Sequence, residues 1–243
     1  MFDRAAFEIE KEQDIARAKA DQSLRNMGLE FVELSDKYKY GYNWTWMGLP
    51  IIQMPEDIVL TQELLWHLKP DFVIEAGVAW GGSLAMYAAF LELTEKGKVF
   101  GIDVTIPTHN RDAIMKCSVS DRISLIEGSS TDLGIFEFVK SQIPSESTVL
   151  LILDSNHTHE HVYNELNLWS PLVKKGSYII VSDTIVEEIP EQTHRPRPWG
   201  PGNNPGTAAR QFLKENTRFT SKNAYSDRTF ASFNPNGYLL ALE

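Results

Sequence analysis

Acidic residues stand at the ends of five short apolar segments in the middle of the chain. In parallel strands of an open α/β sheet the carboxyl ends lie at one edge, and ligands bind beyond that edge. One acid there would merely begin a loop, but five in succession predict a shared binding site. The five are Glu75, Asp103, Glu127, Asp154 and, one residue further beyond its segment, Asp183.

A glycine-rich turn follows the first of these segments, with the sequence Glu75-Ala-Gly77-Val-Ala-Trp-Gly81-Gly-Ser83. Glycines let a ligand approach the backbone closely, and the helix that follows offers a partly positive N-terminus. The G-x-x-x-G spacing differs from the G-x-G-x-x-G of dinucleotide sites and suits a nucleoside with a methionine tail. Asp103 stands 22 residues after Gly81, where a carboxylate can bind both ribose hydroxyls. Gly77, Gly81 and Asp103 together predict an adenosine-containing ligand.

Asp154 and Asp183 follow the fourth and fifth segments and are predicted to share a divalent cation through hard oxygen ligands. His157 lies three residues after Asp154. A neutral imidazole beside such a cation can remove a proton from an alcohol. The alternative is that the histidines at 157, 159 and 161 are solvated residues of a helix start. We favour the functional interpretation for His157 and the solvated one for His159 and His161.

The elements that must position these residues alternate between strand and helix. Nearly continuous apolar segments are typical of parallel strands covered on both faces, so the chain is predicted to be α/β and Rossmann-like. Residues 2–24 have a weak, alanine-rich apolar face and predict one helix, residues 38–46 an aromatic loop, and residues 55–68 a helix. Residues 1–68 are therefore expected to form an N-terminal region and residues 69–243 the ligand-binding domain. A Pro/Gly-rich loop at 190–206 is expected to act as a lid, and the chain to end in two strands, 217–224 and 238–242.

Composition narrows the function classes. The formal net charge of −10, without any run of Lys or Arg, argues against a nucleic-acid partner held by its phosphates. No secretory signal or membrane-spanning segment is recognisable, so we expect a cytoplasmic protein. The single cysteine, Cys117, has no catalytic pattern around it. The N-terminal helix and the aromatic segment predict a homo-oligomer, a dimer or larger.

From about Trp66 to its end the sequence resembles the cephalosporin hydroxylase / rhamnosyl O-methyltransferase family of class I methyltransferases. The resemblance lies in a series of motifs. They are Lys69–Gly77, Gly81–Ser83, Gly101–Asp103, Leu153–His159, Tyr163–Leu166, Pro196–Trp199, Asn204–Ala208 and Asn236–Leu239.

The resemblance implies a mostly parallel seven-stranded Rossmann-like sheet with an antiparallel last strand. It implies S-adenosylmethionine as methyl donor and Mg²⁺ at the acceptor site. The chain is also similar to macrolide-sugar O-methyltransferases of this family, in which a histidine three residues after a metal-binding aspartate is the base. Carried onto this sequence, Asp154 and Asp183 are metal ligands and His157 is the base. The donor is lined by Glu75, Gly77, Ser83, Asp103 and Ser129, together with Gly81 and Asp154.

One position departs from the family pattern. Many members carry Glu-Asp at the end of the fifth strand, where this chain has Ser182-Asp183. The loss of one carboxylate is expected to weaken metal binding unless Glu187, Glu188 or substrate hydroxyls compensate.

The predicted reaction is O-methylation of a sugar or polyol. Arg195, Arg197 and Trp199 in the Pro-rich loop are candidates for closing over this acceptor. An aromatic platform favours a sugar, whereas arginines favour a phosphate; the alternative is a structural loop with its arginines in solvent. Two other functions stay open: a nicotinamide-dependent oxidoreductase on a related fold, and a non-catalytic S-adenosylmethionine-binding protein. The glycine spacing disfavours the first, and the presence of Asp154, His157 and Asp183 disfavours the second.

Overall fold

A seven-stranded sheet forms the centre of the protein, which we describe for residues 3–243 from a computed structural model. The strand order is β5-β4-β3-β6-β7-β9-β8, and only β9 runs antiparallel to its neighbours. This confirms the predicted Rossmann-like α/β class and the antiparallel last strand. The strands are β3 (Phe72–Ala76), β4 (Lys98–Asp103), β5 (Ile123–Glu127), β6 (Val149–Leu153), β7 (Tyr178–Val181), β8 (Phe219–Thr220) and β9 (Tyr238–Ala241).

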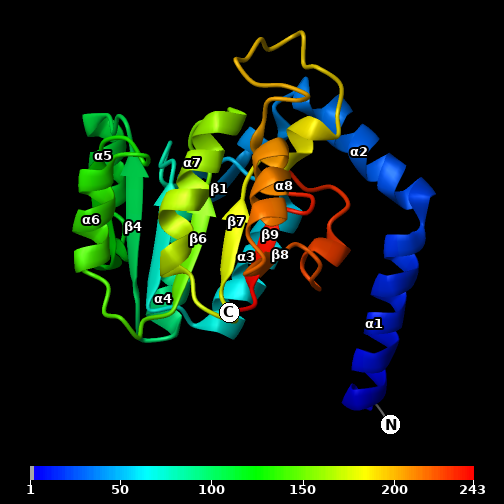
Figure 1. Cartoon of the computed structure of the whole chain (residues 1–243), viewed down its shortest axis with the longest axis horizontal. Helices are drawn as coiled ribbons and strands as arrows, with labels where there is room; N and C mark the ends of the chain where they lie inside the picture. Colours follow the sequence, from blue (N-terminus) through cyan, green and yellow to red (C-terminus); the bar gives the residue numbers. More distant parts are fainter. Residues whose placement is uncertain (1–2) are drawn as a thin grey trace.

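Helices cover both faces of this sheet, which is why the central strands are apolar throughout (Figure 1). All five residues of β6 are buried. Alternate residues of each strand face opposite layers. The helices of the two layers and of the N-terminal region are α1 (Arg4–Ala20), α2 (Gln22–Asp36), α3 (Pro55–Leu68), α4 (Gly82–Leu93), α5 (Thr108–Met115), α6 (Leu133–Ser141), α7 (His159–Trp169) and α8 (Pro205–Glu215).

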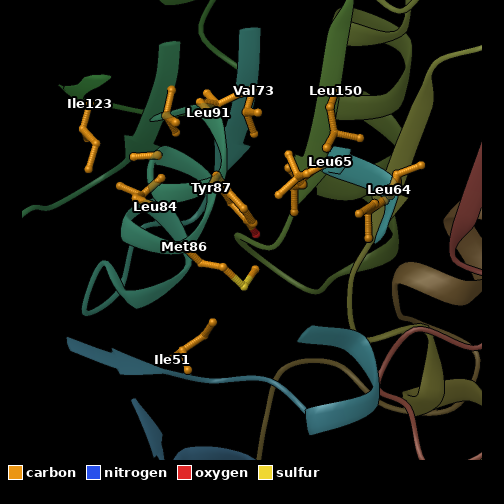
Figure 2. Close-up of a cluster of buried hydrophobic side chains, with 14 of the residues drawn as sticks. Ile51, Leu64, Leu65, Val73, Leu84, Met86, Tyr87, Leu91, Ile123 and Leu150 are labelled. Atoms are coloured by element: carbon orange, nitrogen blue, oxygen red, sulfur yellow. The ribbon is translucent and has the colours of Figure 1, made fainter. Parts of the chain in front are cut away.

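One core layer lies between the sheet and α3 and α4 (Figure 2). Leu84, Tyr87 and Leu91 of α4 pack with Leu64 and Leu65 of α3, and all five side chains are almost fully buried. The other layer packs α6, α7 and α8 against the opposite face of the sheet. Because α3 shares a core with the sheet, the helix is an integral part of the structure around the site. The division of the chain between residues 68 and 69 stays a prediction.

The strand order reverses between β3 and β6. The chain leaves β3 toward β4 and β5, and then returns to place β6 and β7 on the other side of β3. Loops that follow two neighbouring strands therefore diverge at this point and leave a crevice beyond their carboxyl ends. The glycine turn after β3 and the Asp154 loop after β6 border this crevice, so the topology brings the predicted motifs together.

The N-terminal helix is divided in two, contrary to the single helix expected over residues 2–24. Asp21 lies in extended conformation, and its carboxylate accepts hydrogen bonds from the backbone N–H groups of Ser23 and Leu24. The side chain thus caps α2 and separates it from α1, which extends away from the sheet (Figure 1). Residues 1 and 2 lie outside the described part of the chain.

The aromatic segment is more regular than the expected loop. It contains a short 3-10 helix, η1 (Tyr40–Tyr42), and a hairpin of β1 (Trp44–Trp46) and β2 (Leu49–Ile51). The hairpin crosses the start of α4, where a Cβ atom on Gly82 would lie 2.2 Å from the carbonyl oxygen of Pro50. This close approach places residues 50–53 at the edge of the crevice.

The Pro-rich loop bridges the end of η4 (Thr184–Glu187) and α8. Beyond one isolated bridge between Gly200 and Asn203, residues 190–203 contain no helix or strand. Asn204 is fully buried and caps α8 by accepting a hydrogen bond from the backbone N–H of Thr207. Among residues 3–243 no helix has the length and apolarity needed to cross a membrane.

A buried carboxylate connects α3 to the segment before β9. Asp57 accepts hydrogen bonds from the Ser232 hydroxyl, the Phe233 backbone N–H and the Tyr238 hydroxyl, at 2.5, 2.8 and 3.2 Å. Desolvation outweighs these donors and raises the pKa of Asp57 to about 7 from 3.8. The native state therefore binds a proton here that the unfolded chain releases near pH 4.

This raised pKa predicts how stability changes with pH. Because the folded pKa lies above the unfolded value, the stabilisation is complete below pH 4 and is lost as the pH rises toward 7. Asp57→Asn should remove a slope of up to about 1.4 kcal/mol per pH unit from the free energy of unfolding. Urea unfolding at several pH values between 4 and 8 measures it. Asp121→Asn, an exposed change of the same charge, is the control, and equal slopes in both variants would contradict the assignment.

Candidate active site

A cavity of about 480 Å³ lies beyond the carboxyl ends of β3, β4, β6 and β7. Its volume falls in the range of pockets that hold a cofactor or a small substrate. Most residues predicted from the sequence line it, and three do not: Glu75, Glu127 and Ser129. The residues that line it are Gly77, Gly81, Ser83, Asp103, Asp154, His157, Asp183, Arg195, Arg197 and Trp199.

The glycine turn is shaped by contacts that only glycine permits. Gly77 has a φ of 100°, and a Cβ atom there would lie 2.0 Å from the carbonyl oxygen of Asp154. Oδ2 of Asp103 accepts hydrogen bonds from the backbone N–H groups of Val78 and Ala79, at 2.9 and 3.3 Å. The carboxylate therefore fixes the turn while lining the cavity.

Glu75 lies beneath the turn and does not line the cavity. It is fully buried, and its carboxylate accepts hydrogen bonds from the hydroxyls of Ser83 and Tyr87 at 2.7 and 2.8 Å. Desolvation raises the pKa of Glu75 to about 8, although both hydroxyls oppose the shift. The residue connects the end of β3 to α4, so its contact with a donor is indirect, through Ser83.

Ser129 also lies outside the cavity lining. Its hydroxyl is 2.9 Å from that of Thr131, whereas the neighbouring Gly128 and Ser130 line the cavity. We therefore expect the contact between this loop and the methyl donor from Gly128 and Ser130, the residues on either side of Ser129. Glu127, the third acid of the series, accepts a hydrogen bond from the backbone N–H of Ile106 and pairs with Arg111 instead of entering the cavity.

Asp154, His157 and Asp183 form a cluster in which one ligand atom of each lies within 4.8 Å of the others. Nε2 of His157 is 3.3 Å from Oδ2 of Asp183. Burial raises the pKa of Asp154 well above its usual value, and the carboxylates of Asp183 and Glu75 raise it further. Buried carboxylates normally have a positive partner. Two acids and an imidazole in this arrangement fit a divalent cation.

Neither glutamate considered as a substitute for the family's missing carboxylate joins this cluster. Glu187 accepts hydrogen bonds from Gly202 and Asn204 and pairs with Arg210, while Glu188 pairs with Arg25. Ser182 is buried, and its backbone N–H donates to the carbonyl of Leu153. His157 is the third side chain that the fold brings to the two aspartates.

His157 in the loop after β6 and His159 and His161 in the first turn of α7 have separate environments. His157 meets the ring of Trp199 edge-on, with centroids 4.8 Å apart. His159 bridges α7 to α8 through Thr207 and Gln211, at 2.8 and 3.0 Å. The expectation that His159 and His161 are solvated is wrong, because His159 has these partners and His161 lines the cavity.

The structure adds residues that sequence reasoning missed. Gln53 lines the cavity and is 7% exposed, and its Oε1 atom is buried without a hydrogen-bond partner in the described part of the chain. Ser130, Ser155 and His161 surround the fully buried carboxylate of Glu165 at the cavity wall. An apolar wall comes from Val32 of α2 and from Ile185, Ile189 and Phe233. No spacing pattern in the sequence marks these positions, because only tertiary packing joins them.

Comparison with known proteins places the chain among methyltransferases. Residues 38–242 match the family model described as Rhamnosyl O-methyltransferase/CmcI. The rhamnosyl O-methyltransferase of Mycobacterium tuberculosis strain H37Rv is 28% identical over 200 residues, which are 81% of this chain and 77% of the relative. The enzyme of the same name from Mycobacterium leprae is 32% identical over 156 residues, or 61% of this chain and 65% of the relative.

Solved structures share the fold. A CmcI structure with Mg and SAM is 21% identical, with a TM-score of 0.57 over 83% of this chain and 78% of that one. An O-methyltransferase from Bacillus cereus in complex with SAH is 15% identical, with a TM-score of 0.52 over 82% of each chain. Since the family model spans the crevice and both of its motif-bearing loops, the chain belongs to the rhamnosyl O-methyltransferase/CmcI family.

Proposed function

We propose that the protein transfers the methyl group of S-adenosylmethionine to a hydroxyl of a sugar, with the help of a divalent cation such as Mg²⁺. The observation that carries this proposal is a single cavity bordered on one side by the glycine turn and Asp103 and on the other by Asp154, His157 and Asp183. Methyl transfer requires donor and acceptor to meet in line. Rhamnosyl O-methyltransferases among the relatives support a sugar as acceptor.

The donor half fits an adenosine with an amino-acid tail. Asp103 keeps lone pairs for ribose hydroxyls, and the glycine turn lets the ligand approach the backbone. The Oε1 atom of Gln53 is buried and has no hydrogen-bond partner in the described part of the chain, so it can accept a hydrogen bond from the ammonium group of such a tail. The nicotinamide alternative has no comparable support, because the G-x-x-x-G turn lacks the spacing of a pyrophosphate site.

The acceptor half contains the groups needed for chemistry at a hydroxyl. S-adenosylmethionine supplies an electrophilic methyl group, and Mg²⁺ bound there lowers the pKa of the hydroxyl. We assign Asp154 and Asp183 as ligands, since Mg²⁺ prefers oxygen. His157 takes the proton of the hydroxyl, and Trp199 orients the imidazole from its edge. The hydroxyl oxygen would form the new C–O bond to the methyl carbon, as sulfur leaves with the electron pair of the broken C–S bond.

The first test of the proposal is binding of S-adenosylhomocysteine, which the methyl donor becomes after transfer. Calorimetric titration should show that the wild-type chain binds S-adenosylhomocysteine and does not bind NAD. Asp103→Asn keeps an oxygen for the glycine turn but removes the charge that favours ribose hydroxyls, so its affinity should fall about tenfold, or about 1.4 kcal/mol. Asp121→Asn is the matched surface control. Absence of S-adenosylhomocysteine binding to the wild type would refute the proposed donor.

The role of His157 has its own test. With a sugar acceptor, His157→Ala should reduce kcat by about 10²- to 10⁴-fold, the usual contribution of a general base, with donor affinity unchanged. His67→Ala, whose ring pairs with Tyr225 outside the cavity lining, is the control. Mg²⁺ titration of each variant separates two roles. If His157→Ala keeps its affinity for Mg²⁺ while Asp183→Asn loses it, His157 is a base. If both variants lose their affinity for Mg²⁺, His157 is a metal ligand.

We further propose that the protein self-associates through α2. Gly28 and Val32 of this helix face the protein interior, and an adjacent face of the helix is apolar and exposed. This exposed face repeats at the alternating three- and four-residue spacing with which one helix pairs with another copy. Its residues are Leu24, Met27, Phe31 and Leu34, with 37, 64, 44 and 48% exposure. The cytoplasmic location expected from the sequence stays a prediction.

Light scattering tests this assembly. The wild-type mass should be at least twice 27.6 kDa. Met27→Glu with Leu34→Glu should yield a monomer, because a charge in a paired apolar face is desolvated without a partner. Glu30→Gln, on the same helix but outside the apolar face, should keep the wild-type mass. A monomeric wild type, or an unchanged mass in the double variant, would contradict the proposal.

A further inference from the structure

Arg195 has donor groups that the protein leaves without partners. Its Nε and Nη1 atoms are buried, and neither has a hydrogen-bond partner in the described part of the chain. Nη1 lies 3.4 Å from Oδ1 of Asp36, and the guanidinium stacks on the ring of Tyr42 at 5.4 Å. Buried N–H groups without partners are rare in folded proteins and commonly bind a ligand or water. Arg195 also lines the cavity, which places these N–H groups at its wall.

Arg197 adds a second positive charge to the lining of the same cavity. The side chain is exposed and lines the cavity. Its guanidinium lies over the ring of Trp199 at 5.3 Å, and residues 3–243 provide no carboxylate as an ion-pair partner. Arginine binds carboxylates and phosphates through paired N–H groups, and these are free in Arg197.

The positive charges of Arg195 and Arg197 are not balanced by the carboxylate of Asp36 alone. Asp36 forms the ion pair with Arg195 that residues 3–243 provide, and its other oxygen, Oδ2, is 2.9 Å from Nε2 of His194. The same cavity is also lined by the carboxylates of Asp154 and Asp183, which belong to the candidate metal cluster. The two arginines outnumber the carboxylate that pairs with Arg195, in a chain whose net charge is −10.

Trp199 contacts both His157, the proposed base, and Arg197. Its ring is 4.8 Å from that of His157 and 5.3 Å from the guanidinium of Arg197. The proposed base and the free cation therefore both contact one aromatic side chain. A sugar ring has similar width, so a hydroxyl of a sugar placed at His157 leaves the far side of that sugar near Arg197.

From these contacts we propose that the acceptor is an anionic sugar, with a carboxylate or phosphate group bound by Arg195 and Arg197 about one sugar unit from the methylated hydroxyl. The inference rests on the proposed methyl transfer for the position of the hydroxyl, but the anion site itself is independent of that reaction. A uronic acid and a sugar phosphate share the required chemistry.

Direct binding of three model sugars tests the proposal. Methyl β-glucuronide provides a carboxylate, glucose 1-phosphate a phosphate, and methyl β-glucoside neither. Titration into wild-type protein, with and without S-adenosylhomocysteine and Mg²⁺, should show at least one charged sugar bound tenfold or more tightly than the neutral one. The sugar that gains this affinity identifies carboxylate or phosphate as the group.

Variants locate the site. Arg197→Gln, an exposed change, should lower affinity for the charged sugar about tenfold and leave that for methyl β-glucoside and S-adenosylhomocysteine unchanged. Arg195→Gln should do the same, and circular dichroism checks that the variant folds although Asp36 has lost its ion pair with Arg195. Arg17→Gln on α1, which has 78% side-chain exposure, is the matched control.

The outcomes distinguish this inference from the proposed function. If S-adenosylhomocysteine fails to bind while a charged sugar binds through Arg197, the donor assignment fails and the anion site stands. Equal affinity for charged and neutral sugars, no measurable binding of any of the three, or unchanged affinity in both arginine variants overturns the anion site, whatever the donor does.

Discussion

The close approach of Gly77 to the backbone of Asp154 is the constraint on which the site depends. Any side chain at position 77 would overlap the carbonyl oxygen of Asp154, so the loops after β3 and β6 can meet only through glycine. Their contact lies where the strand order reverses. It brings the turn that suits an adenosine next to the aspartate that suits a metal, without any connection between them along the sequence.

Two buried acids, Glu75 and Asp57, stabilise the elements around this contact through hydrogen bonds. Glu75 joins the end of β3 to α4 through Ser83 and Tyr87, and Asp57 joins α3 to the segment before β9. Both carboxyl groups are desolvated, and the pKa of each is raised for that reason. They act as polar connections between helices and strands, and the solvent-facing chemistry falls to Asp103, Asp154, His157 and Asp183.

The sequence predicted the sheet well because parallel strands buried on both faces are apolar throughout, as in β6. The acids at the strand ends were recognisable for the same reason. Whether each predicted residue faces the cavity was not recognisable, since Glu75 turns toward α4 and Ser129 toward Thr131. The break at Asp21, the hairpin at 44–51 and the cavity position of Gln53 depend on caps and long-range packing that have no periodic pattern.

The Pro-rich loop is anchored at both ends, by buried Ile189 and by fully buried Asn204, and it adds no strand to the sheet. None of residues 190–203 belongs to the two core layers of the sheet, so substitutions at their exposed positions are expected to leave those layers intact. Selection is therefore free to redesign this segment while the rest of the enzyme stays folded. Within one lineage, new acceptor preferences can arise by changes in roughly a dozen residues, with little cost in stability, because exposed loop positions contribute little to it.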